Sequence, residues 1–120
     1  MSEPEYVSFD EEEYRSALEA ARQEFEGVDL RSVDFSTAQD ASAEIRATCV
    51  ELRSIGRRVC LILPRPLRRD PLCIPLNLPD GSIVRACLYV CTFWGIPIGA
   101  CVRVYLAGEL VAKRCIGACS

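Results

Sequence analysis

Apolar and polar residues alternate along residues 81–116, and this period of two predicts three consecutive β-strands. In the first of these strands, Leu88 and Val90 alternate with Tyr89 and Cys91. One face of the predicted sheet is therefore aliphatic, whereas the other carries cysteine, tyrosine and arginine. We expect the aliphatic face to line a core formed by Val84, Leu88, Val90, Val102, Val104 and Leu106 together with Leu18, Phe25, Ile45 and Leu52.

Two helices are predicted before these strands. Ser8 and Glu11 have the spacing of a capping box, and apolar residues then recur every three or four positions until Gly27. Ser36 begins a second capping box, which is followed by a second apolar stripe that ends at Gly56. Each helix has one apolar side, which suits packing against the aliphatic face of the sheet.

The segment between the second helix and the last three strands adds two further strands. Residues 59–63 are an uninterrupted apolar run typical of a buried strand, and residues 72–78 predict a strand that Pro75 restricts to a sheet edge. The predicted fold is α+β with two layers: two N-terminal helices pack on one face of a four- or five-stranded antiparallel β-sheet, in the order ααβββββ. Residues 1–7 are expected to form a flexible segment and residues 8–120 a single domain.

The composition is that of a globular protein. Of the 120 residues, 50% are hydrophobic and 26% are charged. No apolar run approaches the roughly 18 residues needed to cross a bilayer, so we expect no membrane partner. Residues 1–13 are acidic and lack the apolar centre of a signal peptide. These features predict a cytoplasmic protein, with the nucleus as a second location.

The chain has eight cysteines and no histidine. The absence of histidine excludes Ser-His-Asp and Cys-His catalysis and histidine-ligated zinc sites. Because cytoplasmic cysteines stay reduced, we predict free thiols with no metal or other cofactor. If loops of three residues join the last strands, Cys101 lies opposite both Cys91 and Cys115. A thiol-ligated metal or redox site that also uses Cys119 is an alternative.

The cysteine, tyrosine and arginine face of the predicted sheet is the main candidate site, because no third layer is left to cover it. Tyrosine, tryptophan and arginine are enriched among the residues that dominate binding energy at interfaces. The predicted interface consists of Tyr89, Cys91, Trp94, Cys101, Arg103 and Tyr105. The chain has no phosphate-binding loop and no evident base for a cysteine nucleophile. We therefore predict a non-enzymatic intracellular interaction module, such as an adaptor, inhibitor or accessory regulator, that forms a homodimer or binds another protein through this face.

A second candidate surface is rich in arginine. Residues 1–44 hold thirteen acidic and three basic side chains, a net charge of −10, whereas residues 45–120 hold four acidic and eleven basic ones, a net charge of +7. Five arginines flank the predicted strand 59–63 and the loop after it: Arg57, Arg58, Arg65, Arg68 and Arg69. If this loop folds back along the sheet, these arginines can contact phosphates or an acidic partner. The alternative function is therefore a nucleic-acid-binding regulator.

Overall fold

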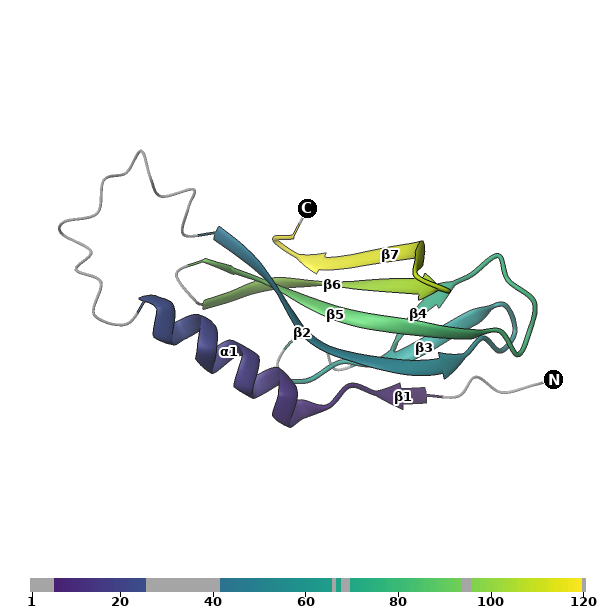
Figure 1. Ribbon diagram of the computed structural model, residues 1–120, viewed down its shortest axis with the longest axis horizontal. Helices are drawn as coiled ribbons and strands as arrows, with labels where there is room; N and C mark the ends of the chain where they lie inside the picture. Colours follow the sequence, from purple (N-terminus) through teal and green to yellow (C-terminus); the bar gives the residue numbers. More distant parts are fainter. Residues whose placement is uncertain (1–5, 26–41, 66, 68–69, 94–95, 120) are drawn as a thin grey trace.

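The computed structural model describes residues 6–25, 42–65, 67, 70–93 and 96–119. These residues form one helix and seven strands, in the order β1 (Tyr6–Ser8), α1 (Glu11–Phe25), β2 (Ser42–Arg53), β3 (Arg58–Ile62), β4 (Leu72–Pro75), β5 (Ile83–Phe93), β6 (Ile96–Leu106) and β7 (Glu109–Gly117) (Figure 1). A four-stranded antiparallel sheet has the order β2-β5-β6-β7. A three-stranded sheet has the order β1-β3-β4 and is mixed, because β1 runs parallel to β3.

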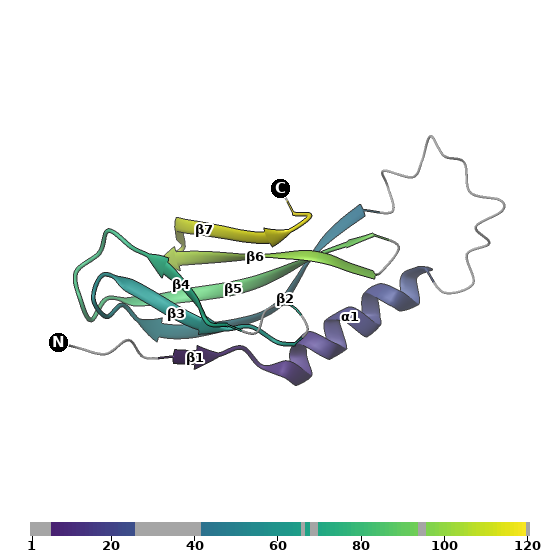
Figure 2. The ribbon, with the colours of Figure 1, turned by 180° about the vertical axis from the view of Figure 1, so that it is seen from behind.

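The two sheets and the helix enclose a hydrophobic core. Seen from behind, β3, β4 and α1 lie over one face of the four-stranded sheet (Figure 2). The buried members of the core are Phe9, Tyr14, Leu52, Val59, Leu61, Leu63, Leu72, Ile74, Leu76, Val84, Ala86, Leu88, Val90, Ala100, Val102 and Val104. The aliphatic face of the large sheet is thus covered jointly by one helix and a small sheet, which together form the second layer.

Helix α1 begins after Asp10 rather than at the predicted capping residue Ser8, which lies in β1. The Asp10 Oδ1 atom accepts hydrogen bonds from the backbone N–H groups of Glu12, at 2.9 Å, and Glu13, at 3.2 Å. A short acidic side chain at this position satisfies amides that the first turn leaves without a partner. The predicted end at Gly27 lies outside the described residues. Within the described residues, no helix has the length and apolar character needed to cross a membrane.

The predicted second helix is wrong, because the described part of that segment forms β2, antiparallel to β5. A register shift between Arg46 and Thr48 places one extra residue in β2, so the inward-facing side chains fall at Ile45, Thr48 and then every second residue. The predicted helical stripe included Ile45 and Leu52, which pack in the core, and Cys49, which points to the opposite side of β2, so it mixed the two faces of one strand. Gly56, predicted to end the helix, has a φ of 66° in the turn between β2 and β3. Residues 26–41, where the second helix was expected to begin, lie outside the described residues.

The predicted C-terminal meander is confirmed as β5, β6 and β7, but the pairing next to both hairpins differs from the prediction, since Phe93 pairs with Ile96 and Leu106 with Glu109. Cys101 lies opposite Cys115, as predicted. Cys91 lies opposite Gly99 instead of Cys101, because the hairpin between β5 and β6 is tighter than the predicted loop and the register shifts after Cys91. Of the two cysteines predicted to lie opposite Cys101, Cys115 does so and Cys91 does not.

The predicted core is confirmed at its positions in β5 and β6. The side chains with exposures of 2% or less include Val84, Leu88, Val90, Val102 and Val104. Leu52 is also buried. Three further predicted residues are partly buried and pack against the same cluster, namely Leu18, Ile45 and Leu106. The side chain of Phe25 lies outside the described part of the structure.

Replacement of Leu88 tests which face of β5 is buried. Leu88→Ala is expected to lower the free energy of unfolding by roughly 2–5 kcal/mol, because it removes buried contacts and leaves a cavity. Denaturant unfolding followed by circular dichroism measures this change. The control is Ile83→Ala on the same strand, where the side chain is 60% exposed; it should change the free energy by less than about 0.5 kcal/mol. A neutral Leu88→Ala would contradict the assignment.

Candidate functional site

The candidate site is the face of the four-stranded sheet that points away from the core, which we call the outer face. Side chains alternate between the two faces along each strand, so the neighbours of the buried residues point outward. The outer face contains Glu44, Arg46, Cys49, Glu51, Arg53, Arg85, Cys87, Tyr89, Cys91, Gly99, Cys101, Arg103, Tyr105, Lys113 and Cys115. The structure thus places every described residue of the predicted interface on one face. Trp94 lies outside the described residues.

Tyr89, Arg103 and Tyr105 form a connected cluster on the outer face. The Arg103 guanidinium lies 4.1 Å from the centroid of the Tyr89 ring, a cation–π contact, and it also forms a salt bridge with Glu44. The hydroxyl oxygens of Tyr89 and Tyr105 are 3.4 Å apart. Because Arg103 comes from β6 and Glu44 from β2, the arginine spans β5 and connects strands that are not adjacent.

The two hydroxyls of this cluster ionise unequally. The hydrogen bond from Tyr105 lowers the pKa of Tyr89, with further help from Arg103 and against the opposing effect of burial. The pKa of Tyr105 is raised, first because of its hydrogen bond to Tyr89 and then because of burial. When the pair loses a proton, Tyr89 is therefore the acceptor and Tyr105 the donor.

β2 contributes two charged residues that the sequence analysis missed. Glu44 pairs with Arg103, and Arg46 lies opposite Tyr89 on the neighbouring strand. Both were overlooked because this segment was expected to be part of the second helix. The alternation of Glu44, Ile45 and Arg46 before the bulge is the signal that indicates a strand here.

A shallow hollow of about 500 Å³ opens on the outer face beside the cluster. Its lining includes Arg46, Arg85, Tyr89, Tyr105 and Glu51. Within the described residues, neither Arg46 nor Arg85 forms an ion pair. The lining thus combines two arginines and two tyrosines with one glutamate, so basic side chains outnumber acidic ones.

All eight cysteines are paired, so the predicted free thiols are wrong. The four disulfides are Cys49–Cys87, Cys60–Cys73, Cys91–Cys119 and Cys101–Cys115. Two of them join cysteines 13 and 14 residues apart. This spacing is one strand plus one turn, which places two cysteines opposite each other on neighbouring strands, and it is the sequence signal for these two disulfides.

The disulfides also contradict the predicted cytoplasmic or nuclear localisation. Thiols stay reduced in those compartments, whereas disulfides form and persist in oxidising environments. Four disulfides in a domain of this size point to an extracellular or secreted protein.

The Cys91–Cys119 disulfide requires the chain after β7 to cross β6 on the outer face. Cys91 lies opposite Gly99, and Gly99 lies opposite Gly117, so the crossing passes over a position that has no side chain. A β-carbon at Gly99 would lie 2.7 Å from the backbone nitrogen of Ala118. Gly117 has a φ of 72°, which glycine adopts without steric cost, and the chain turns there toward β5.

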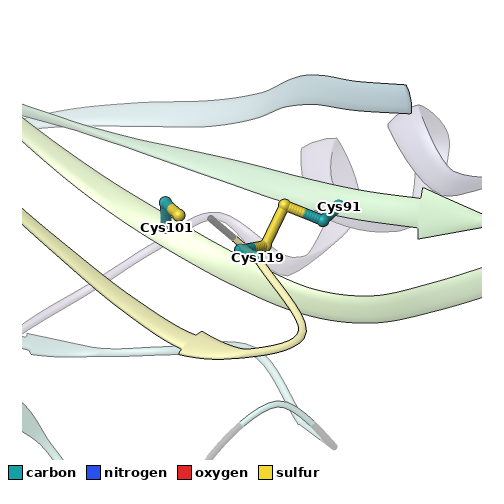
Figure 3. Close-up of side chains that lie close together, drawn as sticks. All are labelled: Cys91, Cys101 and Cys119. Carbon is teal, nitrogen blue, oxygen red and sulfur yellow. A yellow bond between two sulfur atoms is a disulfide. The ribbon is translucent and has the colours of Figure 1, made fainter. Parts of the chain in front are cut away.

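This crossing brings two disulfides together. The Sγ atoms of Cys91, Cys101 and Cys119 lie within 4.8 Å of one another (Figure 3). Cys101 belongs to the separate disulfide with Cys115, and it is fully buried. Metal ligation requires thiolates, so a metal site at these cysteines requires that both disulfides first be reduced.

The predicted arginine surface is described only in part. Arg57 directly precedes β3 and Arg58 is its first residue, whereas Arg65 follows its end. The five residues of β3 separate these two positions by roughly 15 Å. Arg68 and Arg69 lie outside the described residues. The described arginines therefore stand at opposite ends of one strand.

No protein-family model matches the chain, and neither a curated protein nor a solved structure is significantly similar to it.

Replacement of Gly99 tests the crossing of the chain over β6. Gly99→Ala is expected to keep Cys119 from reaching Cys91, because the added carbon would occupy the path of the backbone near Ala118. Alkylation of the unreduced protein followed by peptide mass spectrometry should then find alkylated Cys91 and Cys119. The remaining three disulfides serve as the internal control and should stay formed. If Gly99→Ala forms all four disulfides as readily as the wild type, the crossing is not as described.

Proposed function

We propose that the protein is a non-enzymatic interaction module that works in an extracellular environment and binds a protein partner through the outer face. The observation that carries this proposal is the cluster of Tyr89, Arg103 and Tyr105 on a sheet face that α1 and the small sheet leave uncovered. Tyrosine and arginine combine contact area with directed hydrogen bonds. The disulfides support the proposal further, because a face that is rigid before binding loses less entropy on binding.

The charge of the outer face favours a partner that presents acidic groups. The basic side chains on it are Arg46, Arg53, Arg85, Arg103 and Lys113, and the acidic ones are Glu44 and Glu51. Two copies stacked through this same face would bring like charges together, which costs free energy. The hollow lined by Arg46 and Arg85 offers a place for a carboxylate of the partner. An acidic protein surface is therefore the partner we propose, ahead of a symmetric homodimer.

The acidic surface that binds the outer face can also belong to a second copy of this protein. Glu11, Glu12 and Glu13 are exposed in the first turn of α1, and they offer an acidic surface on the protein itself. The outer face of one copy can meet this helix of the next copy, which is a head-to-tail contact rather than a symmetric one. The nucleic-acid alternative has less support, because the described arginines near β3 are separated along the strand.

The double variant Tyr89→Glu with Arg103→Glu tests the proposed surface. Immobilised wild-type protein should capture an acidic partner from an extract of the source, and the capture should weaken as salt screens the opposite charges. The double variant should lose this capture while keeping the circular dichroism spectrum and thermal unfolding of the wild type, because neither side chain belongs to the core. Sedimentation velocity of the purified proteins reports self-association in parallel.

The matched control makes the same substitutions on the small sheet. Tyr6→Glu with Arg58→Glu changes an exposed tyrosine of β1 and an exposed arginine of β3, and it should leave capture unchanged. If the control loses capture while the outer-face variant keeps it, the arginines that flank β3 form the binding surface and the proposal is wrong.

A further inference from the structure

We propose that the Cys91–Cys119 and Cys101–Cys115 disulfides form a thiol–disulfide exchange site, which captures a low-molecular-mass thiol as a mixed disulfide. The site is the cluster in which three Sγ atoms from two different disulfides lie within 4.8 Å of one another (Figure 3). The described residues include all eight cysteines, and among them this is the one cluster of three potential ligand atoms. The inference goes beyond partner binding and does not depend on it.

Exposure decides which sulfur an external thiolate attacks. Cys101 is fully buried, whereas Cys91, Cys115 and Cys119 are each half-buried. A thiolate attacks a disulfide at the sulfur it can reach, and the other sulfur leaves. An attack at Cys115 therefore releases Cys101, and the thiolate of Cys101 is formed beside the Cys91–Cys119 disulfide. The restricted access to half-buried sulfurs favours a small thiol over a folded protein.

The exchange takes two balanced steps. The external thiolate attacks the Sγ atom of Cys115, so that a mixed disulfide forms, the bond to Cys101 breaks and Cys101 leaves as a thiolate. The Cys101 thiolate then attacks the Sγ atom of Cys119, so that a Cys101–Cys119 bond forms and Cys91 leaves as a thiolate that takes a proton from water. Each step breaks one disulfide and forms one, so no oxidant or reductant is consumed. If the external thiolate attacks Cys119 instead, Cys91 leaves as a thiolate and attacks the Sγ atom of Cys101. Cys115 then leaves as the free thiol.

The second disulfide makes the captured thiol persist. At an isolated disulfide, the released thiolate stays next to the mixed disulfide and attacks it again with a high effective concentration. Here the released Cys101 has another disulfide within reach and is consumed by it. The free thiol therefore ends on a cysteine that belonged to the other disulfide, which is a signature that an isolated disulfide cannot produce.

The experiment locates the adduct and the free thiol on the wild-type protein. Oxidised protein is incubated with reduced glutathione, the reaction is quenched with acid and an alkylating reagent, and the unreduced peptides are mapped by mass spectrometry. We expect the glutathione adduct on one disulfide of the cluster and the alkylated thiol on the other, for example on Cys115 and Cys91. If the adduct and the thiol occupy Cys115 and Cys101, or if no adduct forms at the cluster, the proposal is overturned.

Two matched variants test the relay without any added thiol. Cys115→Ser leaves the Cys101 thiol beside the Cys91–Cys119 disulfide, and we expect the free thiol to redistribute onto Cys91 or Cys119. The control Cys73→Ser leaves another fully buried thiol, on Cys60, which lies outside any such cluster and should stay in place. A thiol that remains on Cys101 alone would overturn the relay, and the wild-type experiment decides the matter if either variant fails to fold.

Discussion

Three disulfides cross-link the strands of the large sheet on its outer face, and the arrangement of the proposed site depends on them. They are Cys49–Cys87 between β2 and β5, Cys101–Cys115 between β6 and β7, and Cys91–Cys119 between β5 and the segment after β7. Each closed loop removes entropy from the unfolded chain, a contribution to stability of roughly 2–4 kcal/mol. The outer face therefore gains stability without aliphatic packing, which leaves room on its surface for tyrosine and arginine side chains.

The two faces of the large sheet differ in what holds their side chains in place. The inner face packs against the small sheet and α1. The Thr48 hydroxyl donates a hydrogen bond of 2.7 Å to the Glu13 carboxylate in the first turn of the helix. The outer face holds Arg103 between Tyr89 and Glu44, so its polar groups are oriented by one another rather than by the core. Substitutions of the tyrosine and arginine side chains on the outer face, unlike those of its cysteines, should consequently change the proposed binding more than folding. The proposed exchange site lies on this same face, so a captured thiol would lie beside the proposed binding surface.

The sequence predicts the parts of this structure that follow a simple period. The burial of Leu88 and the pairing of Cys101 with Cys115 both follow from alternation and a short turn. β2 was mistaken for a helix because the predicted stripe joined Ile45 and Leu52, which pack in the core, to Cys49, which lies on the outer face. The disulfides were missed because localisation was inferred from the acidic N-terminus and decided how every cysteine was interpreted. The Cys91–Cys119 pairing has no periodic signal, since it depends on two glycines that let the chain cross a strand.

The most direct test of this account is a disulfide map of the purified protein. Protease digestion without reduction, followed by mass spectrometry, should yield four linked peptide pairs and no alkylated cysteine. The decisive pair is Cys91–Cys119, because it requires both the register of β5 on β6 and the crossing at Gly99. Eight alkylated cysteines, or a link between Cys91 and Cys101 in the untreated protein, would contradict the account.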